Sequence, residues 1–283
     1  MTYAYNSDIR LGTVKLNVRD LQSQTDFYTN IIGFKILERN ENSVSLTTDS
    51  KEARMILETT DVDSKLTYGL YHTAILVPDR NSLGLALRHL VMNGAELEGG
   101  ADHGYSEAIY LHDLDGNGIE IYRDKPTTEW DIRDNGQIIG VTEELDAQGL
   151  IDNLANETDT FQLPEATKVG HVHLSVKDAL KSSKLYQNVF SLGDKMTVPS
   201  ASWIASGNYH HHLAFNQWAG PGLDNRFEGA PGLAYLTIEY SDTLLYQASL
   251  KKAQLYGMAI LSQKEKEYIS EDSDGIRTLV ILK

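Results

Sequence analysis

The chain offers histidine, aspartate and glutamate, but no cysteine, as side chains that could bind a metal or move protons. The absence of cysteine excludes disulfides, zinc–thiolate sites, iron–sulfur clusters and thiol nucleophiles. Three of the nine histidines form the run 210–212, and two more, His72 and His171, lie in strand-like segments. Imidazole is both the commonest metal ligand and the side chain whose pKa suits acid–base catalysis near neutral pH. Metal binding or proton transfer at these positions is therefore the first chemistry to consider.

The elements that position these residues belong to an internal repeat. Residues 16–30 (LNVRD leading to FYTN) match residues 174–188 (LSVKD leading to LYQN). Each segment predicts an alternating strand, an aspartate at the N-cap and an amphipathic helix. The N-cap residues are Asp20 and Asp178, so the segment that holds His171 has a counterpart near the start of the chain.

Two further segments, starting at Tyr71 and at Ala234, share the same layout. Their N-cap aspartates are Asp79 and Asp242. Gly94 and Gly257 fall where each helix should end, a position that favours a left-handed residue. All four segments continue into about three alternating runs separated by turn residues, so the repeating unit is a strand, a helix and three strands.

The repeat predicts an α+β protein of four such modules, at about 10–60, 68–124, 167–218 and 231–283. An acidic stretch of low periodicity, 127–166, reads as a linker with one short helix around 143–154. It divides the chain into an N-terminal half, 1–126, and a C-terminal half, 167–283.

At this point the sequence resembles the vicinal oxygen chelate superfamily of βαβββ proteins, which includes glyoxalase I and the extradiol dioxygenases. The resemblance is carried by residues 16–34, by GHVHLSVKD at 170–178 and by DGNGIEIY at 115–122. It implies that pairs of modules close cupped mixed sheets, described as barrels, around one metal. The first and last strands of a module supply the ligands.

Comparison of the modules then selects a ligand set. The first-strand column, where the resemblance implies a metal-binding histidine, contains Thr13, His72, His171 and Tyr235. When the last strands of modules two and four are aligned, Glu120 falls at the same position as Leu279. Two imidazoles and one carboxylate form the ligand set of non-haem Fe(II) oxygenases, and Mn(II) fits the same ligands. Because these ligands must meet at one metal, modules two and three are expected to share one barrel, with modules one and four in the other.

The run at 209–215 (YHHHLAF) resembles a segment of the extradiol dioxygenases whose second histidine is the acid–base group. That residue maps to His211. Strand alternation would place His210 and His212 on the opposite face, and a shift of register would exchange the roles. Tyr110 and His103 resemble the active-site tyrosine and loop histidine of the same enzymes. Further candidates for the wall of a substrate pocket are Tyr209, His210, Trp203 and Trp218.

The closest resemblance in detail is to bacterial catechol 2,3-dioxygenases, which implies cleavage of a small aromatic diol by O₂. The metal would be Fe(II), or alternatively Mn(II). Two alternatives remain: another reaction on the same metal, of the glyoxalase or hydroquinone-cleaving type, and a metal-free protein that binds small molecules. A glyoxalase would want a second carboxylate where module three has Ala214 or Phe215. The metal-free alternative predicts that the three ligands lie apart.

A calcium-binding loop is a competing interpretation, because residues 113–118 match the opening of an EF-hand. The twelfth position is Asp124 and not glutamate, and strand-like residues flank an Asn-Gly turn, so a hairpin is favoured. The formal charge of −15 argues against binding to nucleic acid or an anionic membrane. We expect a cytoplasmic protein without a membrane span, and a homodimer is compatible with the resemblance.

Overall fold

The computed structural model describes residues 2–63, 65–152, 154 and 161–283. Within them the four repeated units fold as predicted, each with a strand, a helix and three more strands, and one additional short strand precedes this set in unit one. The first two units contain β1 (Ile9–Leu11), β2 (Val14–Val18), α1 (Leu21–Asp26), η2 (Phe27–Ile31), β3 (Lys35–Arg39), β4 (Ser43–Thr47) and β5 (Met55–Thr59), then β6 (Gly69–Leu76), α2 (Arg80–Met92), β7 (Leu97–Asp102), β8 (Ser106–His112) and β9 (Gly118–Asp124).

The third and fourth units repeat this order after the linker. They contain β13 (Lys168–Ser175), α4 (Ala179–Phe190), β14 (Gly193–Val198), β15 (Ala201–Ala205) and β16 (Leu213–Asn216), then β17 (Gly232–Tyr240), α5 (Thr243–Leu255), β18 (Ala259–Gln263), β19 (Glu267–Glu271) and β20 (Arg277–Leu282). In every unit the first strand pairs in parallel with the last.

The helix boundaries follow the predicted caps. The carboxylates of Asp20, Asp79, Asp178 and Asp242 each accept a hydrogen bond from the backbone N–H three residues later. This contact satisfies one of the amides that a helix start leaves without a partner. After α2 and α5, Gly94 and Gly257 adopt left-handed φ angles of 66° and 84°. The helix boundaries are therefore encoded locally.

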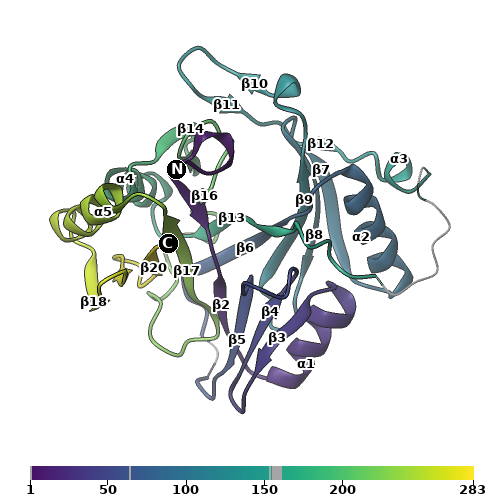
Figure 1. Ribbon diagram of the computed structural model, residues 1–283, viewed down its shortest axis with the longest axis horizontal. Helices are drawn as coiled ribbons and strands as arrows, with labels where there is room; N and C mark the ends of the chain where they lie inside the picture. Colours follow the sequence, from purple (N-terminus) through teal and green to yellow (C-terminus); the bar gives the residue numbers. More distant parts are fainter. Residues whose placement is uncertain (1, 64, 153, 155–160) are drawn as a thin grey trace.

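The units combine into two nine-stranded mixed sheets, so the predicted α+β architecture is confirmed. In one sheet the first strands of units two and three, β6 and β13, pair antiparallel. In the other, β2 of unit one pairs antiparallel with β17 of unit four. The inner modules thus share one sheet and the outer modules the other, and the helices lie at the periphery (Figure 1).

The linker has more structure than its composition indicates. Between η3 (Thr127–Glu129) and the predicted helix, observed as α3 (Ala147–Asp152), lie three short strands. β10 (Asp131–Ile132) and β11 (Ile138–Ile139) form a hairpin, and β12 (Glu143–Glu144) extends the inner sheet beside β7. Two-residue strands carry no detectable alternation, which is why the sequence did not reveal them. Residues 153 and 155–160 of the predicted linker lie outside the described residues.

Two equivalent contacts connect the sheets. The hydroxyl of Tyr28 in unit one donates to Asp113 of unit two at 3.0 Å, and that of Tyr186 in unit three donates to Asp272 of unit four at 3.2 Å. Asp113 also accepts hydrogen bonds from the backbone amides of Asp115 and Asn117. Its oxygens therefore stabilise the predicted hairpin turn, as expected when the calcium loop was set aside. None of the described helices is long and apolar enough to cross a bilayer.

Candidate metal centre

The three predicted ligands lie on neighbouring strands of the inner sheet. Ala74 on β6 pairs with Glu120 on β9 and with His171 on β13. His72 is two residues before Ala74, and side chains two apart on a strand share a face. All three ligands therefore point to the same side, around a central position whose side chain is only a methyl group.

The ligand atoms converge closely. The donor atoms of His72, Glu120 and His171 all lie within 4.8 Å of one another. Glu120 Oε2 is 3.0 Å from the Nε2 atoms of both histidines. The contact of His72 Nε2 with Glu120 does not have the angle of a hydrogen bond, so this buried nitrogen has no hydrogen-bond partner among the described residues. A buried nitrogen without a partner is costly, and a divalent metal held by the three side chains would satisfy it.

The protonation states agree with metal binding. Burial by itself raises the pKa of the Glu120 carboxyl, but the facing imidazoles of His171 and His72 outweigh it and hold that pKa well below its ordinary value. Burial lowers the pKa of His171 to about 4, although Glu120 opposes this change. Metal ligands must be a carboxylate and unprotonated imidazole nitrogens, which these directions favour at neutral pH.

Gly118 permits the close approach of His72 to this site. It pairs with His72 across β9 and β6, and a Cβ atom placed on it would lie 2.1 Å from the Tyr71 carbonyl oxygen. We expect Gly118→Ala to push the two strands apart and to weaken Fe(II) or Mn(II) binding at least about tenfold, the effect typical of a displaced ligand support. Calorimetric metal titration measures this change.

Gly193→Ala is the matched control for this substitution. Gly193 also lies in a strand of the inner sheet, but an added Cβ would meet only ordinary contacts, 3.6 Å from Ala205 O. Its metal affinity should equal that of the unsubstituted protein. Equal affinity in Gly118→Ala would contradict the positioning role of Gly118.

The predicted acid–base residues lie beside the ligands. His211, Tyr110, His103 and the three ligands all line one cavity of about 640 Å³. The imidazole of His211 packs on His171 with ring centroids 4.1 Å apart. Tyr110 pairs with Glu120 across β8 and β9, and its hydroxyl lies 2.6 Å from His103 Nε2. Burial raises the pKa of Tyr110, so its hydroxyl keeps its proton.

The histidine run lies just before β16, which begins only at Leu213. His211 faces the cavity, whereas His212 lines a second cavity of about 610 Å³, so these two side chains point to different sides as the expected alternation implied. His210 does not line the first cavity either. It lies behind His211 and bonds to it, with Nδ1 atoms 2.7 Å apart.

Two of the four predicted wall residues reach the cavity. Trp203 and Trp218 line it, whereas Tyr209 and His210 do not: Tyr209 borders the second cavity. The sequence did not identify His173, which lies two residues after His171 and also lines the cavity. Its Nε2 is 3.1 Å from the Asn216 amide, and its ring lies 5.5 Å from that of Trp218. Period-two spacing from His171 is the signal that could have found it.

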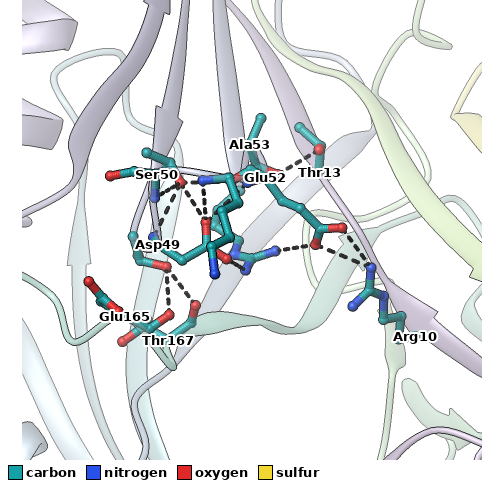
Figure 2. A network of polar contacts seen from close by, with 12 residues as sticks. Arg10, Thr13, Asp49, Ser50, Glu52, Ala53, Glu165 and Thr167 are labelled. Atoms are coloured by element: carbon teal, nitrogen blue, oxygen red, sulfur yellow. Dashed lines mark hydrogen bonds and ion pairs between the residues drawn. The ribbon is translucent and has the colours of Figure 1, made fainter.

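The outer sheet uses its corresponding position differently. Thr13, the counterpart of His72, donates its hydroxyl to Ala53 O at 2.8 Å. Figure 2 shows this bond within a polar network that also contains an ion pair, in which Arg10 Nη2 lies 3.2 Å from Glu52 Oε2. The hydroxyl of Thr48 donates to Thr167 O at 2.9 Å and so connects the same loop to the residue that follows the linker. In the outer sheet a hydrogen-bonding side chain therefore occupies the position that a candidate metal ligand, His72, has in the inner sheet.

Comparison with known proteins agrees with this architecture. Residues 10–121 match the Glyoxalase/Bleomycin resistance protein/Dioxygenase superfamily. A catechol-2,3-dioxygenase of Bacillus subtilis (strain 168) is 38% identical over 239 residues, 82% of this chain and 83% of the relative. Biphenyl-2,3-diol 1,2-dioxygenase 3 of Rhodococcus globerulus is 29% identical over 128 residues, 42% of this chain and 65% of that protein.

Solved structures share the fold at low identity. Glyoxalase I from Zea mays aligns with a TM-score of 0.58 and 17% identity, covering 97% of this chain and 92% of the maize chain. The cppA protein of Streptococcus pneumoniae TIGR4 aligns with a TM-score of 0.55 and 16% identity, covering 98% and 99%. Both alignments span nearly the whole chain, including all four repeated units. The chain belongs to the glyoxalase/bleomycin resistance protein/dioxygenase superfamily.

Proposed function

We propose that this protein is a metal-dependent extradiol dioxygenase that cleaves catechol-type aromatics with O₂. The observation that carries the proposal is the convergence of His72, Glu120 and His171 on a cavity that also exposes His211. Two imidazoles and one carboxylate close one face of a metal and leave the other face for substrate. The similarity to a protein named catechol-2,3-dioxygenase supports the same reaction.

Fe(II) is the metal this ligand set suits best, and Mn(II) is the alternative. Such a metal would act as a Lewis acid and template, binding both vicinal oxygens of the diol and leaving room for O₂. The ring bond beside the diol then breaks, and both atoms of O₂ end in a hydroxymuconic semialdehyde type of product.

The protein side chains would move and hold the protons. His211 accepts a proton from a hydroxyl of the diol and returns it later in the reaction, a role that suits imidazole. Tyr110 keeps its own proton and donates it in a hydrogen bond to His103 Nε2, so its hydroxyl oxygen accepts a hydrogen bond from a substrate hydroxyl. His103 holds the Tyr110 hydroxyl, because its Nδ1 donates to Val141 O at 2.7 Å and its Nε2 is left to accept.

The alternative functions receive less support from the geometry. A metal-free binding protein has no need for three buried ligand atoms within 4.8 Å of one another. A glyoxalase-type site would need a second carboxylate from unit three. There Ala214 pairs with His173, and both Ala214 and Phe215 are fully buried and apolar.

The cavity wall favours uncharged substrates. Among the described residues its aspartate, glutamate, lysine and arginine members are only Glu98 and Glu120, and the aromatic rings of Trp203 and Trp218 also line it. We expect 4-ethylcatechol to have a kcat/KM at least about tenfold higher than 3,4-dihydroxybenzoate, because burying an unpaired carboxylate is costly. Steady-state O₂ uptake with both substrates measures this ratio. A preference for the acid would contradict it.

Anaerobic loading tests the proposal itself. The metal-free protein is loaded with one equivalent of Fe(II) or Mn(II), then mixed with catechol and O₂. We expect equal consumption of catechol and O₂, with a ring-opened semialdehyde identified by mass. Stoichiometric metal without O₂ uptake on catechol or alkylcatechols would overturn the dioxygenase proposal, and turnover of a hemithioacetal would then indicate glyoxalase chemistry.

A further inference from the structure

The first histidine of the run, His210, connects the acid–base histidine to the partly buried carboxylate of Asp124. His210 Nδ1 lies 2.7 Å from His211 Nδ1, and His210 Nε2 lies 2.9 Å from Asp124 Oδ1. His210 is 1% exposed. Asp124 lies on β9 four residues after Glu120. Side chains an even number of residues apart share a strand face, so both carboxylates point to the same side of β9.

The direction of each hydrogen bond follows from the groups present. An ionised carboxylate only accepts, so the proton between His210 and Asp124 belongs to His210 Nε2. In a neutral imidazole that carries its one proton on Nε2, Nδ1 has no proton. His211 Nδ1 must then donate to His210 Nδ1. The remaining nitrogen of His211, Nε2, carries a lone pair, as a base requires.

Other groups hold the carboxylate in place. Tyr5 donates its hydroxyl to Asp124 Oδ2 at 2.8 Å, and Tyr209 donates to Oδ1 at 3.4 Å. With His210, three donors from two parts of the chain converge on Asp124. An aspartate that accepts several hydrogen bonds has a fixed orientation. This assigns Tyr209 a supporting position behind the cavity wall.

The imidazole of His210 is also fixed by packing. Tyr105 stacks on it with ring centroids 4.3 Å apart and planes 11° apart, and Trp130 packs against it at 5.3 Å. The N-terminal segment holds the adjoining loop, because Asn208 N donates to Tyr5 O at 2.7 Å. Rotation of His210 out of its hydrogen bonds would require these contacts to break.

We propose that His210 and Asp124 are positioning residues that hold His211 in its Nδ1–H tautomer, so that Nε2 accepts the proton of a catechol hydroxyl. The arrangement is that of a carboxylate that fixes the tautomer of a catalytic imidazole, extended by one histidine. The catalytic consequence rests on the proposed dioxygenase function. The tautomer does not depend on it and can be measured separately.

Nitrogen NMR tests the tautomer. Long-range ¹H–¹⁵N spectra distinguish Nδ1–H from Nε2–H imidazoles, and the full chain with Zn(II) in the metal site is diamagnetic. We expect His211 as the Nδ1–H form and His210 as the Nε2–H form, with signals assigned from H210Q and H211Q. An Nε2–H tautomer of His211, or a doubly protonated His210 at neutral pH, would overturn the proposal.

Kinetics of Asp124→Asn test the consequence. We expect kcat for catechol to fall about 100-fold. Without the carboxylate, His211 can also adopt the Nε2–H tautomer, whose Nε2 cannot accept a proton. The metal content should not change. For 4-nitrocatechol, which is already largely ionised at neutral pH, the loss should be less than tenfold, since little proton removal is needed. An equal loss with both substrates would indicate a merely structural role and contradict the proposal.

Asp272→Asn is the matched control. Asp272 is a buried aspartate that also accepts a tyrosine hydroxyl, but it belongs to the outer sheet. Its kcat ratio for the two substrates should match that of the unsubstituted protein. If the unsubstituted protein cleaves no catechol, the dioxygenase proposal fails while the NMR result still decides the tautomer. If it cleaves catechol and Asp124→Asn shows no selective loss, the positioning role fails alone.

Discussion

His171→Ala is expected to lose its metal and all O₂-dependent cleavage of catechol. His171 is one of the two histidines whose Nε2 atoms contact Glu120 among the described residues, each at 3.0 Å. Removal of groups that merely support a ligand costs about 10- to 100-fold in metal affinity, so removal of the ligand itself should cost more. Metal analysis of protein loaded and desalted under anaerobic conditions, followed by an O₂-uptake assay, measures both losses.

His89→Ala provides the control for this experiment. His89 lies on α2, where its Nε2 is 2.8 Å from Asn30 O, and it does not line the 640 Å³ cavity. That variant should retain one equivalent of metal and normal turnover. A His171→Ala protein that still holds one equivalent of Fe(II) with normal affinity would place the metal at other residues and remove the basis of the proposed function.

The dependence on His171 also tests the order of the modules. His72 and Glu120 come from unit two, whereas His171 comes from unit three, across the β6–β13 pairing. If consecutive units had formed a sheet, unit two would face Thr13, whose hydroxyl is bonded to Ala53 O. The site therefore exists only because the inner units share a sheet.

Features with a local physical cause could be predicted from the sequence. The N-cap aspartates and the left-handed Gly94 and Gly257 follow from short-range rules, and the repeat made each visible more than once. The ligand set could be predicted because the repeat places His72 and His171 in one column. A requirement that three ligands meet at one metal then indicated which modules pair.

Contacts between distant segments could not be predicted in this way. Asp124 receives the hydroxyl of Tyr5 from the N-terminal segment, and nothing in either local sequence indicates that pairing. The hydrogen bond between His210 and His211 was also inaccessible, since alternation places adjacent side chains on opposite faces. The run ends before β16 begins, so its side-chain contacts needed the three-dimensional structure.

His211→Gln is expected to retain its metal but to lose about 10²- to 10⁴-fold in kcat for catechol, the usual contribution of a general acid–base group. His211 lines the cavity beside His171 without being one of the three ligands, so metal binding and proton transfer should separate in this variant. KM should change little, because glutamine keeps much of the side-chain volume. Steady-state kinetics together with metal analysis measure the two effects.

His212→Gln is the matched control from the same run. His212 borders the second cavity, where its Nδ1 accepts the Ser206 backbone amide at 3.4 Å. Because this ring faces away from the ligands, kcat for catechol should stay within about twofold, as for substitutions outside functional contacts, even if stability falls by about 1 kcal/mol. The reverse result, a large loss in His212→Gln and normal turnover in His211→Gln, would exchange the two histidines. It would also contradict the chain of hydrogen bonds from Asp124 through His210 to His211, since His212 takes no part in it.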